Sequence, residues 1–276
     1  AITADDNSTF SGEIAAASLD ISGDIDVDGT ANLDVVDIDG AVDMATTLTV
    51  AGNVDFNGDL DVDGTTNLDI VDVDGAANFA ADVTFADGAD IITASAGTSN
   101  FRAGVNAGNS IASGGNYNTV VGDEAGTALT TGDSNVIIGM VAGDALTTAS
   151  DNVAVGQGAL TDDTLGSKTV AIGRQALTTQ NFTSATDTYN TAVGHNAGLS
   201  VTTGTHNTLI GGLAGDAVTT GGNNTAVGKS SLSAINTGSD NTAIGQMALS
   251  DDTKGSKSTG VGYQALSSQN FTSATD

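Results

Sequence analysis

The sequence predicts an all-β, fibrous protein built as a repetitive β-solenoid or triangular β-helix. None of the 276 residues is proline, and a chain of consecutive strands needs every backbone N–H for hydrogen bonding. The acidic residues are 32 Asp and only Glu13 and Glu124, and Asp favours turns where Glu favours helices. Thirty-seven glycines, 4 % aromatic residues and internal repeats indicate a repeat protein with a thin core. Because thin rungs bury little surface alone, we expect a homotrimer.

Composition excludes several functional classes. The net charge is −28 and only six residues are Lys or Arg, too few for the cationic surface that nucleic acid requires. No run of about 18 apolar residues occurs, so we expect no membrane insertion. The absence of cysteine excludes disulfides and thiolate metal sites.

Charge and repeats divide the chain into three parts. Residues 1–94 hold 20 Asp, Glu13 and no basic residue, a net charge of −21, whereas the remaining residues carry −7, which together give −28. Residues 95–117 are rich in Gly, Ser and Asn and interrupt both repeats, so we expect a linker there. Residues 118–276 carry the second repeat.

The first repeat alternates with period two. Over residues 48–64 every even position is apolar or Gly, and most odd positions are polar, as in a strand with one buried face. Gly52, Gly58 and Gly64 recur at intervals of six, where the chain would turn a corner. Residues 23–44 also match residues 58–79 at an offset of 35. Residues 1–94 are therefore interpreted as an acidic β-helix with six-residue strands.

The second repeat centres on a glycine preceded by Val or Ile and followed, three positions later, by Ala in eight of nine copies. The spacing is 17 residues, except for 21 between Gly173 and Gly194. Seven copies also carry an Asn four residues before the glycine, and stacked Asn side chains can form an amide ladder. This pattern predicts a nine-rung β-solenoid with glycines at 122, 139, 156, 173, 194, 211, 228, 245 and 262.

The fourth and seventh positions after each glycine vary together. Where the fourth residue after the glycine is Gly, the seventh is apolar, and where the fourth is Leu, the seventh is Asp or Gln. The rung with Leu232 and Ile235 is an exception. The exchange keeps apolar volume nearly constant, as expected for close packing around one interior. Residues 152–187 also match residues 241–276 at an offset of 89, with 24 identities over 36 positions, so we expect a segment of a longer fibre.

The motifs NTAVGHNAG, NTAIGQMAL and KTVAIGRQAL resemble repeats of phage tail fibres, which often precede an endosialidase-type intramolecular chaperone domain. They are also similar to head repeats of trimeric autotransporter adhesins, which form left-handed parallel β-rolls in a trimer, although the 17-residue period is longer than that family's unit. DVDGTTNLDIVDVDG and TTLTVAGNVDFNG resemble fibre segments of marine phages. These resemblances imply a trimeric extracellular fibre.

Two acidic runs resemble the start of a calcium-binding loop. Each has three alternating Asp residues followed by Gly, but the residue at position 12, where such a loop places Glu, is Val35 or Ile70. The runs are interpreted either as a solvated acidic strand face or as a weak Ca²⁺ site, and no other cofactor is expected. The six candidate ligands are Asp24, Asp26, Asp28, Asp59, Asp61 and Asp63.

The four-residue insertion between Gly173 and Gly194 is the candidate receptor-binding loop. It falls in QNFTSATDTY, residues 180–189, and the octet QNFTSATD returns at residues 269–276. Loops that project from a rigid scaffold often bind partners. Phe182 and Tyr189 are therefore candidates for contact with a glycan or protein, or else fill a local hydrophobic gap.

Enzymatic chemistry is not expected. The pairs Asp162/Asp163 and Asp251/Asp252 are adjacent in sequence, whereas glycoside hydrolysis needs two opposed carboxylates in a cleft. His195 and His206 are interpreted as surface residues on neighbouring rungs, and a metal or catalytic role is the less favoured alternative.

The function we expect is that of a structural segment of a phage tail fibre, extracellular and carried on the virion, which spaces or presents a host-binding tip. Its partners would be copies of itself, other virion proteins and a host cell-surface glycan or protein. The alternatives are a bacterial or archaeal surface adhesin or extracellular filament built from the same repeats and, less favoured, a β-helical depolymerase.

Overall fold

The computed structural model describes residues 95–271 and 273, together with the separate positions 50, 51, 54, 71, 73 and 77. The chain divides into two compact units, Ala1–Asn78 and Phe79–Asp276, and residues 95–271 belong to the second. The acidic β-helix expected over residues 1–94 lies outside the described residues, apart from those six positions.

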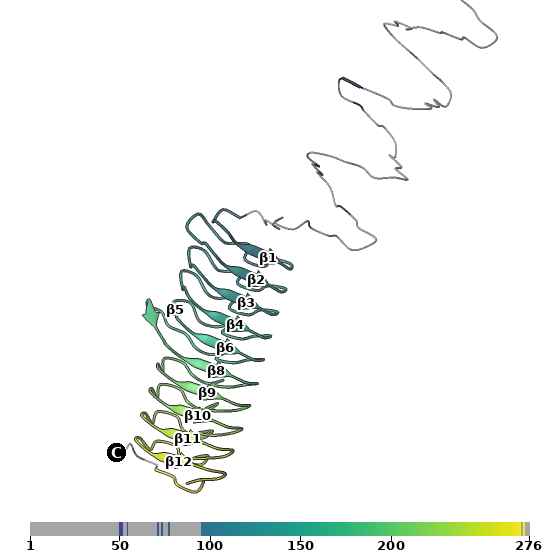
Figure 1. Ribbon diagram of the computed structural model, residues 1–276. Coiled ribbons are helices and arrows are strands. Elements are labelled where there is room, and N and C mark those ends of the chain that lie inside the picture. Colours follow the sequence, from purple (N-terminus) through teal and green to yellow (C-terminus); the bar gives the residue numbers. More distant parts are fainter. Residues whose placement is uncertain are drawn as a thin grey trace, which may run out of the picture. The chain divides into compact units, whose positions relative to one another are not determined.

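The described part of the second unit is all-β, without a helix, and forms the predicted β-solenoid (Figure 1). Ten strands stack in one parallel sheet in the order β1-β2-β3-β4-β6-β8-β9-β10-β11-β12, and each adds one turn, or rung. These strands are β1 (Phe101–Ala103), β2 (Thr119–Val121), β3 (Val136–Ile138), β4 (Val153–Val155), β6 (Val170–Ile172), β8 (Thr191–Val193), β9 (Thr208–Ile210), β10 (Thr225–Val227), β11 (Thr242–Ile244) and β12 (Thr259–Val261).

The segment 95–117 departs from the expectation of a linker, because it carries β1, which pairs in parallel with β2. Its sequence keeps the internal positions of a rung: Ala107 and Ile111, the third and seventh residues after Gly104, are buried. The residue before Gly104 is Ala, and the next glycine of the column, Gly122, follows after 18 residues. These two deviations hide the rung from a search for a Val/Ile–Gly pair every 17 residues.

Each three-residue strand of the main sheet from β2 to β11 contributes one inward and two outward side chains. The middle residue is fully buried in the strands from β2 to β11, for example Ile137, Ala154 and Leu209, whereas the flanking residues are partly or largely exposed. The alanines that follow three residues after the glycines from Gly122 to Gly211, and after Gly245, are also buried, so the interior is narrow.

The predicted exchange of apolar volume is confirmed. Leu129, Leu146, Val201 and Val218, which follow a Gly at the fourth position, are completely buried, and so are the fourth-position residues Leu160, Leu177, Leu232 and Leu249. Most rungs thus fill the same interior from one of two positions, and the rung with Leu232 and Ile235, both completely buried, fills it from both.

A buried ladder of Asn side chains joins the rungs. The backbone N–H of Asn135 donates to Asn118 Oδ1 (2.9 Å), and its Nδ2 donates to the same oxygen (3.0 Å) and to the Ala149 carbonyl (2.9 Å). The same three bonds hold four other members of the ladder: Asn118, Asn207, Asn224 and Asn241. Because each amide is both donor and acceptor, the ladder satisfies buried backbone groups at every rung.

The insertion adds a second, two-stranded sheet. β5 (Gly166–Ser167) pairs in parallel with β7 (Thr186–Asp187), at the side of the main stack in Figure 1. The four additional residues therefore project from the side of the solenoid. They do not change the register of β6 and β8, in which Val170 pairs with Thr191.

The glycine after each strand should be intolerant of a side chain. Gly194 has a φ of +143°, and a Cβ there would lie 2.5 Å from the carbonyl oxygen of Gly211 on the next rung. We expect Gly194→Ala to lower the free energy of unfolding by about 2–4 kcal/mol, through backbone strain and steric clash. Chemical denaturation followed by circular dichroism measures this loss.

Gly212→Ala is the matched control, because a Cβ at Gly212 would come no closer than 3.9 Å to another heavy atom, the carbonyl oxygen of His195. Equal losses in the two variants would contradict the assignment of close backbone stacking to the glycine column.

Candidate functional site

The candidate site is the lateral segment, residues 181–189, which includes β7. The segment has a buried side and an exposed side. The Phe182 side chain is only 7 % exposed, whereas Tyr189 is 50 % exposed. Phe182 is therefore buried, as in the alternative interpretation in which it fills a hydrophobic gap. Of the two aromatic residues, only Tyr189 offers substantial surface to a partner.

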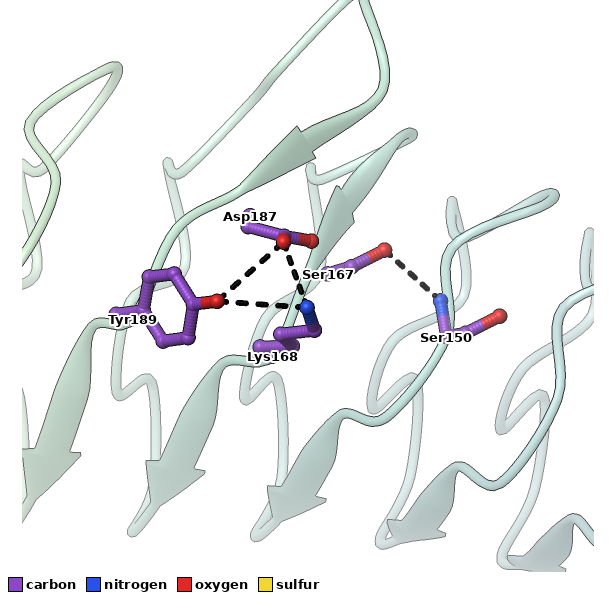
Figure 2. Close-up of polar contacts among 5 residues, drawn as sticks. All are labelled: Ser150, Ser167, Lys168, Asp187 and Tyr189. Atoms are coloured by element: carbon purple, nitrogen blue, oxygen red, sulfur yellow. Dashed lines mark hydrogen bonds and ion pairs between the residues drawn. The ribbon is translucent and has the colours of Figure 1, made fainter.

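The exposed side carries an ion pair with a phenol beside it (Figure 2). Lys168 Nζ lies 2.6 Å from Asp187 Oδ2 and donates to the Tyr189 hydroxyl oxygen (3.4 Å). The Tyr189 hydroxyl in turn donates to Asp187 Oδ2 (3.4 Å). The hydrogen bond to Asp187, and then the one to Tyr189, raise the pKa of Lys168, which therefore stays cationic.

The Tyr189 ring is in contact with residues on the rungs at both sides. The Lys168 ammonium lies 5.4 Å from the ring centroid, and the His206 ring centroid lies 5.3 Å away, tilted by 36°. Such distances suit cation–π and aromatic contacts. Neighbouring side chains therefore hold the ring and its hydroxyl in place, while half of the residue stays exposed.

Backbone conformation places these three side chains in one column. Lys168, Tyr189 and His206 have φ values of 60°, 51° and 60°, in the left-handed region. Each directly precedes the ladder position of its rung, Thr169, Asn190 or Asn207. Next to them, Ser167 Oγ accepts a hydrogen bond from the Ser150 N–H (3.0 Å), so a second column of side chains joins the rungs (Figure 2).

The buried side is held by Asp163. Its Oδ1 accepts from the Gly166 N–H (3.0 Å) and the Phe182 N–H (3.1 Å), and its Oδ2 accepts from Gln180 Nε2 (2.6 Å). The carboxylate is completely buried. Burial raises the pKa of Asp163 above 3.8, although these hydrogen bonds oppose the rise.

The other candidate residues do not come together. His195 Nε2 lies 3.4 Å from Arg174 Nη1, whereas His206 contacts Tyr189, so the two histidines belong to different clusters. Asp162 is exposed and Asp163 is buried, so this pair does not form two opposed carboxylates in a cleft. Within the described residues, no group of three His, Cys, Asp or Glu side chains is placed to hold a metal ion. The six candidate calcium ligands, Asp24 to Asp28 and Asp59 to Asp63, lie outside the described residues.

Three features of this site were not predicted from the sequence: Lys168, Asp187 and the Asp163–Gln180 pair. The available signal was the repeat at an offset of 89, which retains Asp163, Lys168 and Gln180 as Asp252, Lys257 and Gln269. The 17-residue periodicity draws attention to residues common to all rungs, whereas the Asp, Lys and Gln of this site recur only at the offset of 89.

No protein-family model matches the chain, and neither the curated proteins nor the solved structures give a match. None of the residues described forms a helix that could cross a membrane.

Asp163 should make stability depend on pH. Its pKa is higher in the folded chain than the ordinary 3.8, so its contribution to stability is complete below pH 3.8 and is lost as pH rises through the folded-state pKa. Asp163→Asn cannot ionise there, so we expect its free energy of unfolding to fall less steeply with pH above 3.8 than that of the wild type.

Denaturation curves recorded at a series of pH values measure the two slopes. Asp240→Asn, which removes an exposed carboxylate, is the matched control variant. An Asp163→Asn slope equal to that of the wild type would rule out a perturbed buried carboxyl.

Proposed function

We propose that the chain is a non-enzymatic, homotrimeric, extracellular segment of a phage tail fibre, which acts as a rigid spacer or presenter for host attachment. One observation carries this proposal: an uncharged, β-branched stripe that runs along the whole outer face of the main sheet from β2 to β12. The stripe consists of the last residue of each strand: Val121, Ile138, Val155, Ile172, Val193, Ile210, Val227, Ile244 and Val261.

The stripe is partly exposed in the single chain. Its isoleucines are 37–40 % exposed, and the neighbouring outward residues at the start of each strand are all Thr or Val. A continuous apolar face of this kind usually marks an interaction surface. Its partner should match it in length and spacing, and a second and third copy of the same solenoid do so rung by rung.

Charge restricts the association of like chains to this face. The chain carries a net charge of −28, so two copies repel each other, and the repulsion at contact is smallest where uncharged surfaces meet. None of the outward residues in the main-sheet strands β2, β3, β4, β6 and β8 to β12 is charged. Closing three stripes around one axis would bury apolar area while keeping the acidic residues in water.

The continuous sheet and ladder suit a spacer. Every rung from β1 to β12 is hydrogen-bonded to the next through backbone groups, and at most rungs also through the Asn ladder. Bending the rod would stretch many such bonds at once. The lateral segment, with Tyr189 on its exposed side, would then be presented at the side of a stiff rod, where it could meet a host glycan or protein.

Light scattering of the full chain should give the mass of three chains, 26.9 kDa each. We expect Ile172→Asp combined with Ile210→Asp to reduce the mass to that of one chain, because a carboxylate on each of two rungs would have to be buried between copies. Circular dichroism should show that the β structure of the monomer is retained.

Tyr117→Asp is the matched control, since it places the same charge at an exposed apolar residue outside the stripe and should leave the trimer intact. A wild-type chain that is monomeric, or a double variant that stays trimeric, would contradict the proposal. Repeating the measurement in EDTA tests whether divalent cations at the acidic runs also support assembly.

A further inference from the structure

The Asn ladder is interrupted once between Asn100 and Asn241, at Thr169, and the interruption is filled by Gln180. Thr169 N–H still donates to Asn152 Oδ1 (2.9 Å), but its short side chain cannot reach the following ladder residue as Asn does. Asn190 Nδ2 instead donates to Gln180 Oε1 (2.8 Å). The Gln180 amide therefore replaces the missing Asn oxygen from a different position on the rung.

Gln180 connects the ladder to the buried carboxylate. Its Nε2 donates to Asp163 Oδ2 (2.6 Å) and to Thr169 Oγ1 (3.0 Å). Thr169 Oγ1 also lies 2.7 Å from Thr188 Oγ1, which accepts from the Asn190 N–H (3.2 Å). None of these five side chains is more than 1 % exposed, so they form a closed, fully hydrogen-bonded polar cluster.

The same cluster begins again 89 residues later. Gln269 Nε2 donates to Asp252 Oδ2 (3.1 Å) and to Ser258 Oγ (2.8 Å), where Ser258 takes the place of Thr169. Asp252 Oδ1 accepts from the Gly255 N–H (2.9 Å) and the Phe271 N–H (3.2 Å), the counterparts of Gly166 and Phe182. Two pairs of successive rungs, 89 residues apart, thus build the same arrangement.

The polar pair is not needed to fill space. In the rung after Gly228, Leu232 and Ile235 occupy the two positions that Leu160 and Asp163 occupy after Gly156, and both are completely buried. The strand residues beside them are alanines in both rungs, Ala226 and Ala154. An apolar side chain therefore fits where Asp163 lies.

We propose that the Asp163–Gln180 pair fixes the register of the stack at this point. It specifies that the rung of β6 follows the rung of β4, and thereby determines where the lateral segment leaves the solenoid. The pair acts between the rungs of one chain, so this role does not depend on the proposed trimeric fibre. The problem that the pair addresses is inherent in the fold, since repeats of nearly equal sequence can also stack after one rung has been looped out.

Where the rungs carry only the residues common to the repeat, a slip of one rung replaces each contact between rungs with a similar one. If the rung of β9 were looped out, Asn190 could still pair with Asn224, and Val201 would meet another apolar residue. If the rung of β6 were looped out, Asp163 would lose both the Gln180 and the Phe182 donors and remain buried without them. Unpaired buried carboxylates are strongly disfavoured, and fixing register is the best-attested role of buried polar groups.

Disulfide trapping can read the register, because the chain has no cysteine. Lys168 and Tyr189 precede the ladder position on successive rungs, so K168C and Y189C should be about 4.8 Å apart, within disulfide range. A slip that loops out the β6 rung would bring K168C next to H206C instead. After refolding under oxidising conditions, peptide mapping measures both intrachain disulfides.

In the wild-type background we expect only the K168C–Y189C disulfide. In D163I/Q180I, which copies the Leu232–Ile235 rung, we expect circular dichroism to show retained β structure and the K168C–H206C disulfide to form at least about tenfold more than in the wild type. D162N, which removes the exposed neighbouring carboxylate, should behave like the wild type.

The single variants provide a second measurement. D163I and Q180I each remove the hydrogen bond that joins Asp163 to Gln180, so the losses of stability in the two single variants should add up to more than the loss in the double variant. A double variant that keeps only the K168C–Y189C disulfide, that fails to fold, or whose loss of stability exceeds the sum of the two single losses would overturn the proposal.

Discussion

The structure depends on one constraint, the direct stacking of each rung on the backbone of the next. At Gly139 a Cβ would lie 2.7 Å from the Gly156 carbonyl group, so this column admits only glycine. The Asn ladder works at the same spacing, because each side-chain oxygen must reach the backbone N–H of the following rung. These two contacts hold the rung at 17 residues for most of the solenoid and oblige any extra residues to leave it sideways.

Strict stacking turns single residues into columns. A side chain at a given position lies above the same position of the rung before, so a property repeated in sequence becomes a stripe in space. The Val and Ile residues before the glycines become the uncharged stripe, and the residues before the Asn ladder become the exposed column that holds Lys168, Tyr189 and His206. The inward-facing positions are separate from both columns, so the side chains that fill the interior can vary independently of the two surfaces.

Column formation explains how much of the structure could be predicted from sequence. The solenoid, the Asn ladder and the exchange between Leu160-type and Leu146-type rungs follow from spacing alone, because every rung repeats them. β1 was missed because its rung has Ala103 where the others have Val or Ile. The burial of Phe182 and the contacts of Asp187 could not be derived, since they depend on how four inserted residues fold back onto the column. Periodicity describes the common rung and says little about a departure from it.

The departures are nevertheless related to one another. Thr169 in place of Asn, Gln180 in place of an apolar residue, Asp163 one rung earlier and the four-residue insertion all belong to one polar cluster, and the first three recur 89 residues later as Ser258, Gln269 and Asp252. Separately, each of the three residues Thr169, Gln180 and Asp163 would weaken the stack, since it removes a ladder bond or introduces a buried polar group. Together they satisfy one another's hydrogen bonds. A uniform stack offers no reason for a loop to leave at one rung rather than another, and a cluster that is satisfied in only one register supplies that reason.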